Sequence, residues 1–472
     1  MTVSADNPSE LHATFDRLRA DWRDNRPSVE QRRADLSRLR DRLRARMEEM
    51  CQAIDQDFGH RARHETLLGE GGVVLSEIDH TLAKLKHWIR PERRKAGWKL
   101  WPATAEVRFV PLGVVGIISP WNYPVNLALA PLVAAIAAGN HVYLKPSEHT
   151  PRTAEFLRSL LAEVFPETRV AVALGTAELS AAFSALPFDH LFFTGSTAVG
   201  RKVMAAAAEN LTPVTLELGG KSPAIVGEAA DLAKAAARIA TGKFFNAGQT
   251  CIAPDYVLIP EGRRDAFVDL LKREIAARYR SKRGLDDYTS IINDGQYERL
   301  KRLIADAAAR GHRVIPLFEG TEGTVARLRV LPPTLILNPD RDSAVMGEEI
   351  FGPILPVIGY TSIDTAIAYV LDRDRPLALY CFSRDKAEIE AVLSRVVAGG
   401  VCVNDTLYQF GCNDLPFGGV GASGMGHYHG RDGFLTFSKA MPVLRKLDPA
   451  PSDRVKPPYR GIADWVVRFL SR

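Results

Sequence analysis

The stretch VVGIISPWNYPVNLALAPLVAAIAAGNHVYLKPSE, residues 114–148, decides the fold class. It holds a short apolar run at residues 114–118, a long alanine-rich apolar segment, and a second short run at residues 141–145. Proline, glycine and asparagine interrupt the apolar part, so residues 125–144 indicate a buried helix followed by a strand, and not a membrane span. A strand, a helix and a strand in this order predict parallel strands joined by a crossover helix.

The same alternation continues along the chain. Short apolar runs at residues 170–173 and 190–194, again separated by helical segments, extend this first sheet. A second alternation begins after Gly219, with strands expected at residues 223–226, 256–259, 334–337 and 377–382. The sequence therefore predicts an α/β fold with two α/β units, the first of which is typical of nucleotide-binding domains.

Length and composition agree with a large globular enzyme. A chain of 472 residues, with 46% apolar and 25% charged residues, is long enough for two or three domains. Its formal charge of +5 is small, so no nucleic-acid partner is expected. The five cysteines form no CxxC pair, and the N-terminus lacks the basic and apolar parts of a signal peptide. We expect a cytoplasmic protein without disulfides.

The two ends of the chain carry amphipathic patterns. Ser28 and Gln31 form a capping-box pattern that predicts one long helix through residue 54. The last segment places five apolar residues on one helical face: Ile462, Trp465, Val466, Phe469 and Leu470. This tail could lie in a membrane interface, but about three turns is short for that. Packing against the body or a partner subunit is favoured.

Cys251 lies in the segment FFNAGQTCIAPDY, residues 244–256. A lone cysteine is usually a small buried hydrophobic residue. Here Gly248, Gln249 and Thr250 place it in a loop, and we expect the loop to open a helix whose backbone N–H groups and dipole favour the thiolate. The segment therefore predicts a nucleophilic cysteine.

Glu217 lies in LELGGKSP, residues 216–223, at the end of an apolar strand pattern. Most glutamates are solvated, but two leucine neighbours would partly desolvate this one and raise its pKa toward that of a general base. The Gly219-Gly220 turn after it lets a cofactor or another backbone approach closely.

Asn122 lies in SPWNYP, residues 119–124, directly after the strand at residues 114–118. The carboxyl end of a parallel strand is where open α/β sheets bind their ligands. An amide aimed at a developing oxyanion would contribute on the order of 3 kcal/mol to transition-state stabilisation. A helix cap would explain the same asparagine equally well.

Three further motifs suggest a dinucleotide site. In KPSE, residues 145–148, a lysine and a glutamate can hydrogen-bond a ribose at a strand end. GSTAVG, residues 195–200, could seat a pyrophosphate on a helix N-terminus, although Thr197 stands where a GxGxxG fingerprint has glycine. EEIFGP, residues 348–353, offers a carboxylate for a ribose and an aromatic ring for a nicotinamide, or merely ends a helix or strand.

His427 and His429 in GHYHG, residues 426–430, have no apparent third ligand, so no metal site is expected. A loop near the active site is the favoured interpretation of this segment.

Together these motifs resemble those of the aldehyde dehydrogenase superfamily. The set, in order, is PWN at 120–122, KPSE, FTGSTAVG, LELGGKSP, FFNAGQTC, EEIFGP and LPFGGVGASGMG, and it runs from the first helix to about residue 445. FFNAGQTCIAPDYV and GMGHYHG resemble the short, dimeric, class 3-like subgroup that acts on aromatic and longer aliphatic aldehydes. The resemblance implies NAD-dependent oxidation of a small-molecule aldehyde to a carboxylic acid.

The resemblance also implies roles for individual residues. Cys251 would attack the aldehyde, Asn122 with the Cys251 N–H would stabilise the oxyanion, and Glu217 would activate the water that hydrolyses the thioester. The implied cofactor contacts are Ser119, Trp121, Lys145, Ser147, Glu148, Thr194, Gly195, Ser196, Val199, Leu218, Gly219, Glu349 and Phe351. Glu148 would repel a 2′-phosphate, which favours NAD; NADP stays open because Lys145 could partly neutralise that repulsion.

The aldehyde dehydrogenase fold implies a division of the chain. The expected parts are a Rossmann-like NAD-binding domain (1–87 and 107–219), an α/β catalytic domain (220–405), a small bridging and oligomerisation element (88–106 and 406–445) and a C-terminal tail (446–472). The bridging element would pair two subunits of a homodimer.

The substrate is less well defined by the sequence. The residues expected to line its site are Tyr123, Tyr408, Phe410, Cys412 and His429. Aromatic side chains there suit a planar phenylpropenal ring, and they would suit a long alkyl chain too. Two other functions stay open: acyl transfer to coenzyme A or phosphate, against which Glu217 argues, and a structural protein that has lost the chemistry, against which the presence of all three catalytic residues argues.

Overall fold

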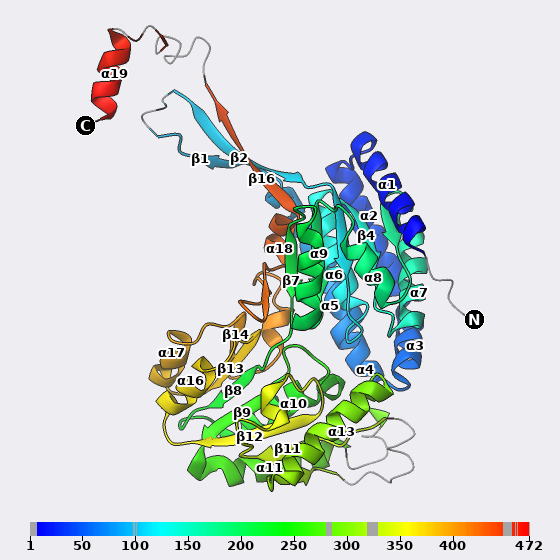
Figure 1. The fold of residues 1–472 in the computed structure, drawn as a ribbon, viewed down its shortest axis with the longest axis vertical. Helices are drawn as coiled ribbons and strands as arrows, with labels where there is room; N and C mark the ends of the chain where they lie inside the picture. Colours follow the sequence, from blue (N-terminus) through cyan, green and yellow to red (C-terminus); the bar gives the residue numbers. More distant parts are fainter. Residues whose placement is uncertain are drawn as a thin grey trace.

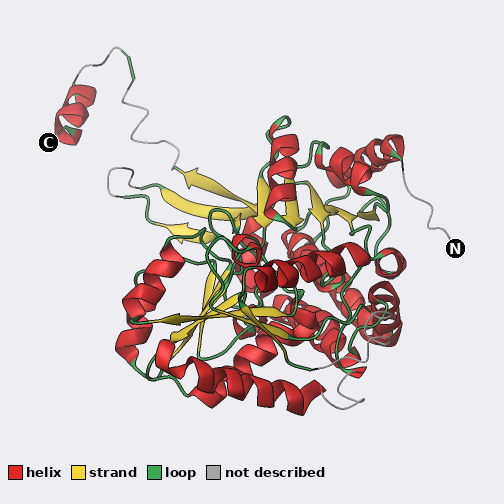
Figure 2. Ribbon diagram, turned by 60° about the horizontal axis from the view of Figure 1, so that its bottom comes forward, coloured by secondary structure: helices red, strands yellow, loops and turns green. Residues whose placement is uncertain are grey.

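A computed structural model of the chain describes residues 7–97, 100, 102–279, 286–318, 329–446, 456–457, 459 and 461–471. The strands form sheets of six, seven and three strands. The six-stranded and the seven-stranded sheets occupy two lobes, and the three-stranded sheet extends from the first lobe as an arm (Figures 1 and 2). The α/β fold expected from the alternation is therefore confirmed.

The six-stranded sheet contains both strands expected within residues 114–148. Its spatial order is β15-β7-β6-β3-β4-β5. The strands are β3 (Val114–Ile118), β4 (His141–Lys145), β5 (Val170–Val172), β6 (His190–Thr194), β7 (Val214–Glu217) and β15 (Gly424–Met425). All pairs are parallel except β15 with β7. The chain leaves β3 first toward β4 and β5 and later toward β6 and β7, which is the Rossmann strand order, with its switch point between β3 and β6.

The helix that crosses from β3 to β4 is α6 (Asn126–Ala138), and all of its residues are buried. It packs against α2, α5 and α18, which explains why its sequence is apolar on every side. Pro131 is accommodated inside it, and Gly139 ends it with a left-handed φ of 101°. The membrane-span alternative is excluded for this segment because it lies inside the protein.

The seven-stranded sheet has the order β10-β11-β12-β9-β8-β13-β14. Its strands are β8 (Pro223–Val226), β9 (Tyr256–Pro260), β10 (Arg313–Pro316), β11 (Thr334–Leu337), β12 (Ile354–Tyr360), β13 (Ala378–Phe382) and β14 (Gly400–Val403). Only β10 pairs antiparallel. The expected strands at β8, β9, β11 and β13 are present, whereas the interior strand β12 and the outer strands β10 and β14 were not foreseen from the sequence.

The arm consists of β1 (Glu92–Arg94), β2 (Thr104–Pro111) and β16 (Ser438–Arg445), all antiparallel. β2 continues to Pro111, beyond the boundary expected at residue 106. Part of the segment expected in the bridging element lies elsewhere, because Gly424 and Met425 pair with β7 in the six-stranded sheet. The division into domains stays a prediction.

Helices cover both large sheets. They are α1 (Pro8–Asp24), α2 (Val29–Ala45), α3 (Met47–Phe58), α4 (Arg63–Thr66), α5 (Gly72–Trp88), α7 (Pro151–Ala162), α8 (Ala177–Ser184), α9 (Thr197–Ala208), α10 (Leu232–Phe244), α11 (Arg264–Tyr279), α13 (Asp294–Ala309), α15 (Ala344–Gly347), α16 (Ile363–Leu371), α17 (Lys386–Leu393), α18 (Gly430–Thr436) and α19 (Ile462–Leu470). A π-helical turn, Leu67–Gly71, connects α4 to α5.

Two expectations about the ends of the chain need correction. The single long helix is wrong: the chain breaks between α2 and α3 at Arg46, whose φ/ψ of −108°/18° is not helical and whose guanidinium binds Glu49 and Glu163. Ser28 does cap α2. Packing of the tail against the body is also wrong, since α19 stands apart from both lobes in Figures 1 and 2 and the Trp465 side chain is 64% exposed.

Candidate active site

Asn122 lies in the loop between β3 and α6 and is buried. Its Nδ2 donates a hydrogen bond to the Gln249 carbonyl oxygen at 3.1 Å, two residues before Cys251. Asn122 does not cap α6. The N-cap residue is Val125, and the carboxylate of Glu70 accepts the Val125 and Asn126 N–H groups instead. The helix-cap interpretation of Asn122 is therefore wrong, and its amide directly joins the loop of the cysteine.

Cys251 lies in a turn between the 3₁₀ turn Phe245–Gly248 and β9. The expectation that this loop opens a helix is wrong, because the strand β9 comes next. Burial and, to a smaller extent, the nearby carboxylates of Glu349 and Glu217 together raise the pKa of the thiol to about 12. Backbone N–H groups of Cys251 and Ile252 act in the opposite direction.

The loop before Cys251 is held by buried amide groups. Asn246, Ala247 and Gly248 all have positive φ, between 50° and 74°. The side chain of Gln249 donates to the Asn246 and Ser290 carbonyl oxygens, both at 3.0 Å. A left-handed backbone at non-glycine residues is unfavourable, so these side-chain bonds explain how the turn is maintained.

Glu217 is the last residue of β7, as the sequence predicted. Its side chain is buried, and neither carboxylate oxygen has a hydrogen-bond partner in the described part of the chain. Burial raises the pKa of Glu217 well above its ordinary value. The charge of Glu217 also raises the pKa of the Cys251 thiol, so the two groups lie within electrostatic range of each other.

Glu349 reaches the glycine turn after Glu217. A Cβ atom on Gly219 would lie 1.8 Å from the Glu349 carboxylate, so no other residue fits at 219 without displacement. The Gly220 N–H donates to that carboxylate, while burial and the charge of Asp255 raise the pKa of Glu349 to about 8. Phe351 has a φ of 48° and sets its ring edge-on to Trp121, with 5.4 Å between ring centroids.

The other residues expected at the cofactor lie together at the carboxyl ends of four neighbouring strands. Ser119 and Trp121 follow β3; Lys145, Ser147 and Glu148 end or follow β4; Thr194, Gly195, Ser196 and Val199 end β6 and open α9; Leu218 and Gly219 follow β7. The Ser196 hydroxyl caps α9 by accepting the Val199 N–H. A cavity of about 500 Å³ opens beside this edge, and Thr197, Gly219, Lys221, Glu349 and Arg373 line part of it.

The five residues expected to line the substrate site separate into an inner and an outer group. The Tyr123 hydroxyl is 2.7 Å from the Thr250 hydroxyl, next to Cys251. The Phe410 ring packs edge-on against His429, a buried residue whose pKa burial lowers to about 4. Tyr408, by contrast, is 75% exposed, and Cys412 is exposed as well.

The chain is similar over nearly its whole length to known aldehyde dehydrogenases. The profile described as aldehyde dehydrogenase family matches residues 5–443. A protein of Pseudomonas aeruginosa named "Probable coniferyl aldehyde dehydrogenase" is 51% identical over 466 residues, covering 98% of this chain and 97% of that protein. The chain belongs to the aldehyde dehydrogenase family. The resemblance seen in the seven motifs is confirmed, and the enzyme is an aldehyde dehydrogenase acting on small-molecule aldehydes.

Two solved structures of aldehyde dehydrogenases have the same fold. The substrate-bound state of Staphylococcus aureus AldH aligns with a TM-score of 0.91 at 38% identity, covering 98% of this chain and 99% of that chain. An NAD⁺ complex of an aldehyde dehydrogenase from Bacillus cereus aligns with a TM-score of 0.85 at 25% identity, covering 94% and 90%. The expected fold class is therefore confirmed, and the likeness supports use of a nicotinamide dinucleotide.

Tyr380 contacts the turn of Cys251 without any signal in the sequence, whereas Tyr428 belongs to the GHYHG segment expected near the active site. Tyr380, in the middle of β13, donates its hydroxyl to the Ile252 carbonyl oxygen at 2.5 Å. The buried Tyr428 side chain lies within electrostatic reach of both Glu217 and Cys251, which raise its pKa together with burial. Tyr380 has the pattern of an ordinary strand residue, and only its position in three dimensions reveals its contact.

The described residues hold neither a metal cluster nor a membrane-spanning helix. None of their His, Cys, Asp and Glu side chains gather in groups of three or more that could hold a metal ion. None of the helices among them is both long enough and apolar enough to cross a membrane.

Proposed function

We propose that the enzyme oxidises coniferyl aldehyde, or a similar aromatic aldehyde, to the carboxylic acid with NAD as hydride acceptor. The observation that carries the proposal is the hydrogen bond from the buried Asn122 amide to the Gln249 carbonyl oxygen, in the turn that holds Cys251, together with a buried Glu217 carboxylate without a hydrogen-bond partner among the described residues. The name of the 51% identical Pseudomonas protein supports the substrate. The aromatic side chains of Tyr123 and Phe410 near this space suit a planar substrate.

In the first step, the Cys251 sulfur forms a bond to the carbonyl carbon and the carbonyl π electrons move to the oxygen. The second N–H of the Asn122 amide and the Cys251 backbone N–H stabilise the resulting oxyanion. Since the thiol has a raised pKa, it must transfer its proton during the attack. That proton passes to water in the same step, so Glu217 stays a free carboxylate for the hydrolysis that follows.

The residues of the site fit a dinucleotide. Gly219 and Glu349 line the cavity of about 500 Å³ beside the strand ends, and the capped N-terminus of α9 can receive a pyrophosphate. When bound there, NAD supplies the acceptor for the hydride that leaves the thiohemiacetal carbon. Glu349 would hold the nicotinamide ribose, and Phe351 would support the ring. Glu148 would repel a 2′-phosphate, which favours NAD over NADP.

Glu217 then removes a proton from the water that attacks the thioester carbonyl. The C–S bond breaks, Cys251 leaves as the thiolate and is reprotonated, and the carboxylic acid is released. The oxyanion formed during hydrolysis occupies the same position as the first, so Asn122 acts in both halves of the reaction. The raised pKa of Glu217 matches this role, because a stronger base accepts the proton of water more readily.

Steady-state formation of NADH with coniferyl aldehyde, benzaldehyde, decanal and acetaldehyde tests the proposal, each with NAD and with NADP. We expect the highest kcat/KM for coniferyl aldehyde with NAD. A higher kcat/KM for decanal would show that the enzyme prefers a fatty aldehyde to an aromatic one. A rate that depends on added coenzyme A would show that the acyl group is transferred to coenzyme A and not to water. No turnover with any aldehyde would contradict the proposal as a whole.

We further propose that the enzyme is a cytoplasmic homodimer paired through the arm of β1, β2 and β16, with the expected domain division. The antiparallel arm extends away from both lobes, which suits contact with a second subunit (Figure 1). The exposed face of α19 would pack on that subunit. Sedimentation equilibrium of the full chain and of a chain ending at residue 446 tests this arrangement, and a full chain that sediments as a monomer would contradict it.

A further inference from the structure

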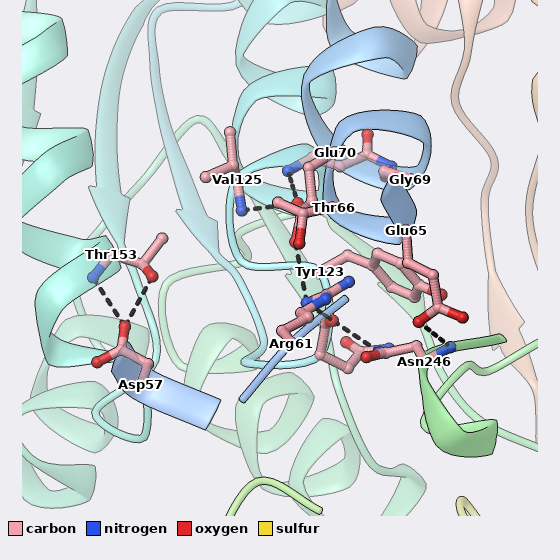
Figure 3. Close-up of polar contacts among 12 residues, drawn as sticks. Asp57, Arg61, Glu65, Thr66, Gly69, Glu70, Tyr123, Val125, Thr153 and Asn246 are labelled. Carbon is pink, nitrogen blue, oxygen red and sulfur yellow. Dashed lines mark hydrogen bonds and ion pairs between the residues drawn. The ribbon is translucent and has the colours of Figure 1, made fainter. Parts of the chain in front are cut away.

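A cluster of charged side chains forms hydrogen bonds with the loop that holds Asn122. It consists of Arg61, just before α4, Glu65 on α4, and Glu70 in the π-helical turn Leu67–Gly71. The side chains of Arg61 and Glu70 are completely buried, with 3.3 Å between Nη1 and Oε1. Figure 3 shows the three side chains beside Tyr123 and Asn246. None of the sequence motifs includes this cluster.

Arg61 contacts the catalytic loop through its backbone. Its Nη1 donates to the Asn122 carbonyl oxygen at 2.8 Å. Asn246 donates from Nδ2 to the same oxygen and to the Gln249 oxygen, both at 3.1 Å. The Asn122 amide donates to the same Gln249 oxygen. Hydrogen bonds to two backbone oxygens, those of Asn122 and Gln249, therefore link Arg61 and the loop of Asn122 to the turn before Cys251.

The carboxylates of Glu70 and Glu65 accept hydrogen bonds from the two backbone segments that Arg61 and Asn246 connect. Glu70 accepts the N–H groups of Val125 and Asn126 at 3.1 and 2.7 Å, which fixes the far end of the same loop. Glu65 accepts the Asn246 N–H at 2.9 Å and so supports a residue with a left-handed φ of 53°. The cluster therefore restrains the loop of Asn122 and the turn before Cys251 together.

Stability alone does not explain Arg61. Its guanidinium lies between the rings of Phe58 and Tyr123, at 4.7 and 4.9 Å from their centroids. Its Nε and Nη2 have no hydrogen-bond partner among the described residues. A buried cation with unfilled donors costs free energy, and an apolar side chain of similar volume would often be as stable there. What an apolar residue cannot do is donate to the Asn122 carbonyl and set the orientation of that residue.

From this geometry we infer that Arg61 is a positioning residue, which holds the Asn122 amide in the orientation that receives the oxyanion. The inference rests on the role proposed for Asn122. Arg61 touches neither substrate nor cofactor and acts only through the Asn122 backbone, so its removal should matter only while the Asn122 amide is present.

A double-mutant cycle with Arg61→Met and Asn122→Ala tests this inference on the full-length enzyme. We expect Arg61→Met to lower kcat about 10-fold, with the KM for NAD unchanged. In the Asn122→Ala background, the same substitution should change kcat by less than about 2-fold. Losses that multiply in the double variant would overturn the inference, because Arg61 would then act independently of Asn122.

Arg32→Met is the matched control. Arg32 donates from Nη1 to the Ala138 carbonyl oxygen at 3.0 Å, at the opposite end of α6. This variant should lower the thermal midpoint and leave kcat unchanged; an equal loss of kcat in Arg32→Met would overturn the inference by showing a general structural effect. If Arg61→Met does not fold, the cycle is run with Arg61→Lys under the same criteria. An Asn122→Ala enzyme with normal kcat would instead contradict the proposed function.

Discussion

The six-stranded and the seven-stranded sheets contribute to the active site in different ways. The six-stranded sheet supplies Glu217 from the end of β7 and Asn122 from the loop that leaves β3. The seven-stranded lobe supplies Cys251 and Glu349 from turns in which neighbouring residues have positive φ. Glu217, at a strand end, is held by the sheet itself, whereas the loop of Asn122 and the turn before Cys251 depend on side chains from distant parts of the chain. Substitutions at the two kinds of position should therefore differ in their effects.

Replacing Cys251 by alanine should have the largest effect. Without the sulfur no thiohemiacetal forms, so kcat should fall at least about 10⁴-fold. The cofactor contacts proposed on the six-stranded sheet remain, so NAD binding, measured by quenching of tryptophan fluorescence, should be unchanged. Cys381→Ala, at a buried thiol of β13 outside the proposed site, is the control and should leave kcat unaffected. Substantial turnover by the Cys251 variant would show that Cys251 is not the nucleophile.

Glu217→Gln tests the strand-end base. Steady-state turnover should fall by about 10³-fold, while one equivalent of NADH per active site still appears in a fast burst. The pH dependence has a defined sign: because burial raises the pKa of Glu217, the carboxylate is protonated below that pKa and cannot act as a base, so hydrolysis should accelerate as pH rises through it. The glutamine variant should lose this rise. An unchanged steady-state rate would assign the base to another group, with Glu349 the nearest candidate.

Asn122→Ala should lower kcat by about 10²-fold, the usual effect of deleting one oxyanion donor. Because the Arg61 and Asn246 bonds reach the Asn122 backbone oxygen, the loop should keep its position in this variant. The rate of Cys251 alkylation by iodoacetamide, which forms no oxyanion, should therefore stay close to that of the unmodified enzyme. A parallel fall in alkylation would mean that Asn122 shapes the turn of Cys251 instead of stabilising the oxyanion.

The smallest effect is expected at the outer substrate residues. Tyr408 is 75% exposed, so Tyr408→Ala should change the ratio of kcat/KM for coniferyl aldehyde to that for acetaldehyde by about 3-fold or less. Phe410 packs against Phe417 and His429, and Phe410→Ala should change the same ratio by about 10-fold. A larger change of this ratio in Tyr408→Ala than in Phe410→Ala would show that the substrate enters beside the exposed turn of Tyr408.

The sequence predicted the parts of the molecule whose signals are local. The alternation of residues 114–148 identified β3, α6 and β4, and the position of Glu217 at a strand end could be inferred from its apolar neighbours. The helix expected at Cys251 was wrong because glycine and small polar residues indicate a turn without specifying whether a helix or a strand comes next. The contact between Arg61 and Asn122 could not be predicted, since it joins residues 61 positions apart and depends on the complete fold.

The central claim is that the aldehyde becomes a thioester on Cys251, and trapping that thioester tests it most directly. Intact-protein and peptide mass spectrometry would be applied to the Glu217→Gln enzyme mixed with coniferyl aldehyde and NAD. We predict one added acyl group per chain, located on the peptide that contains Cys251 and absent when NAD is omitted. A protein of unchanged mass after the NADH burst, or an acyl group on another cysteine, would contradict the account.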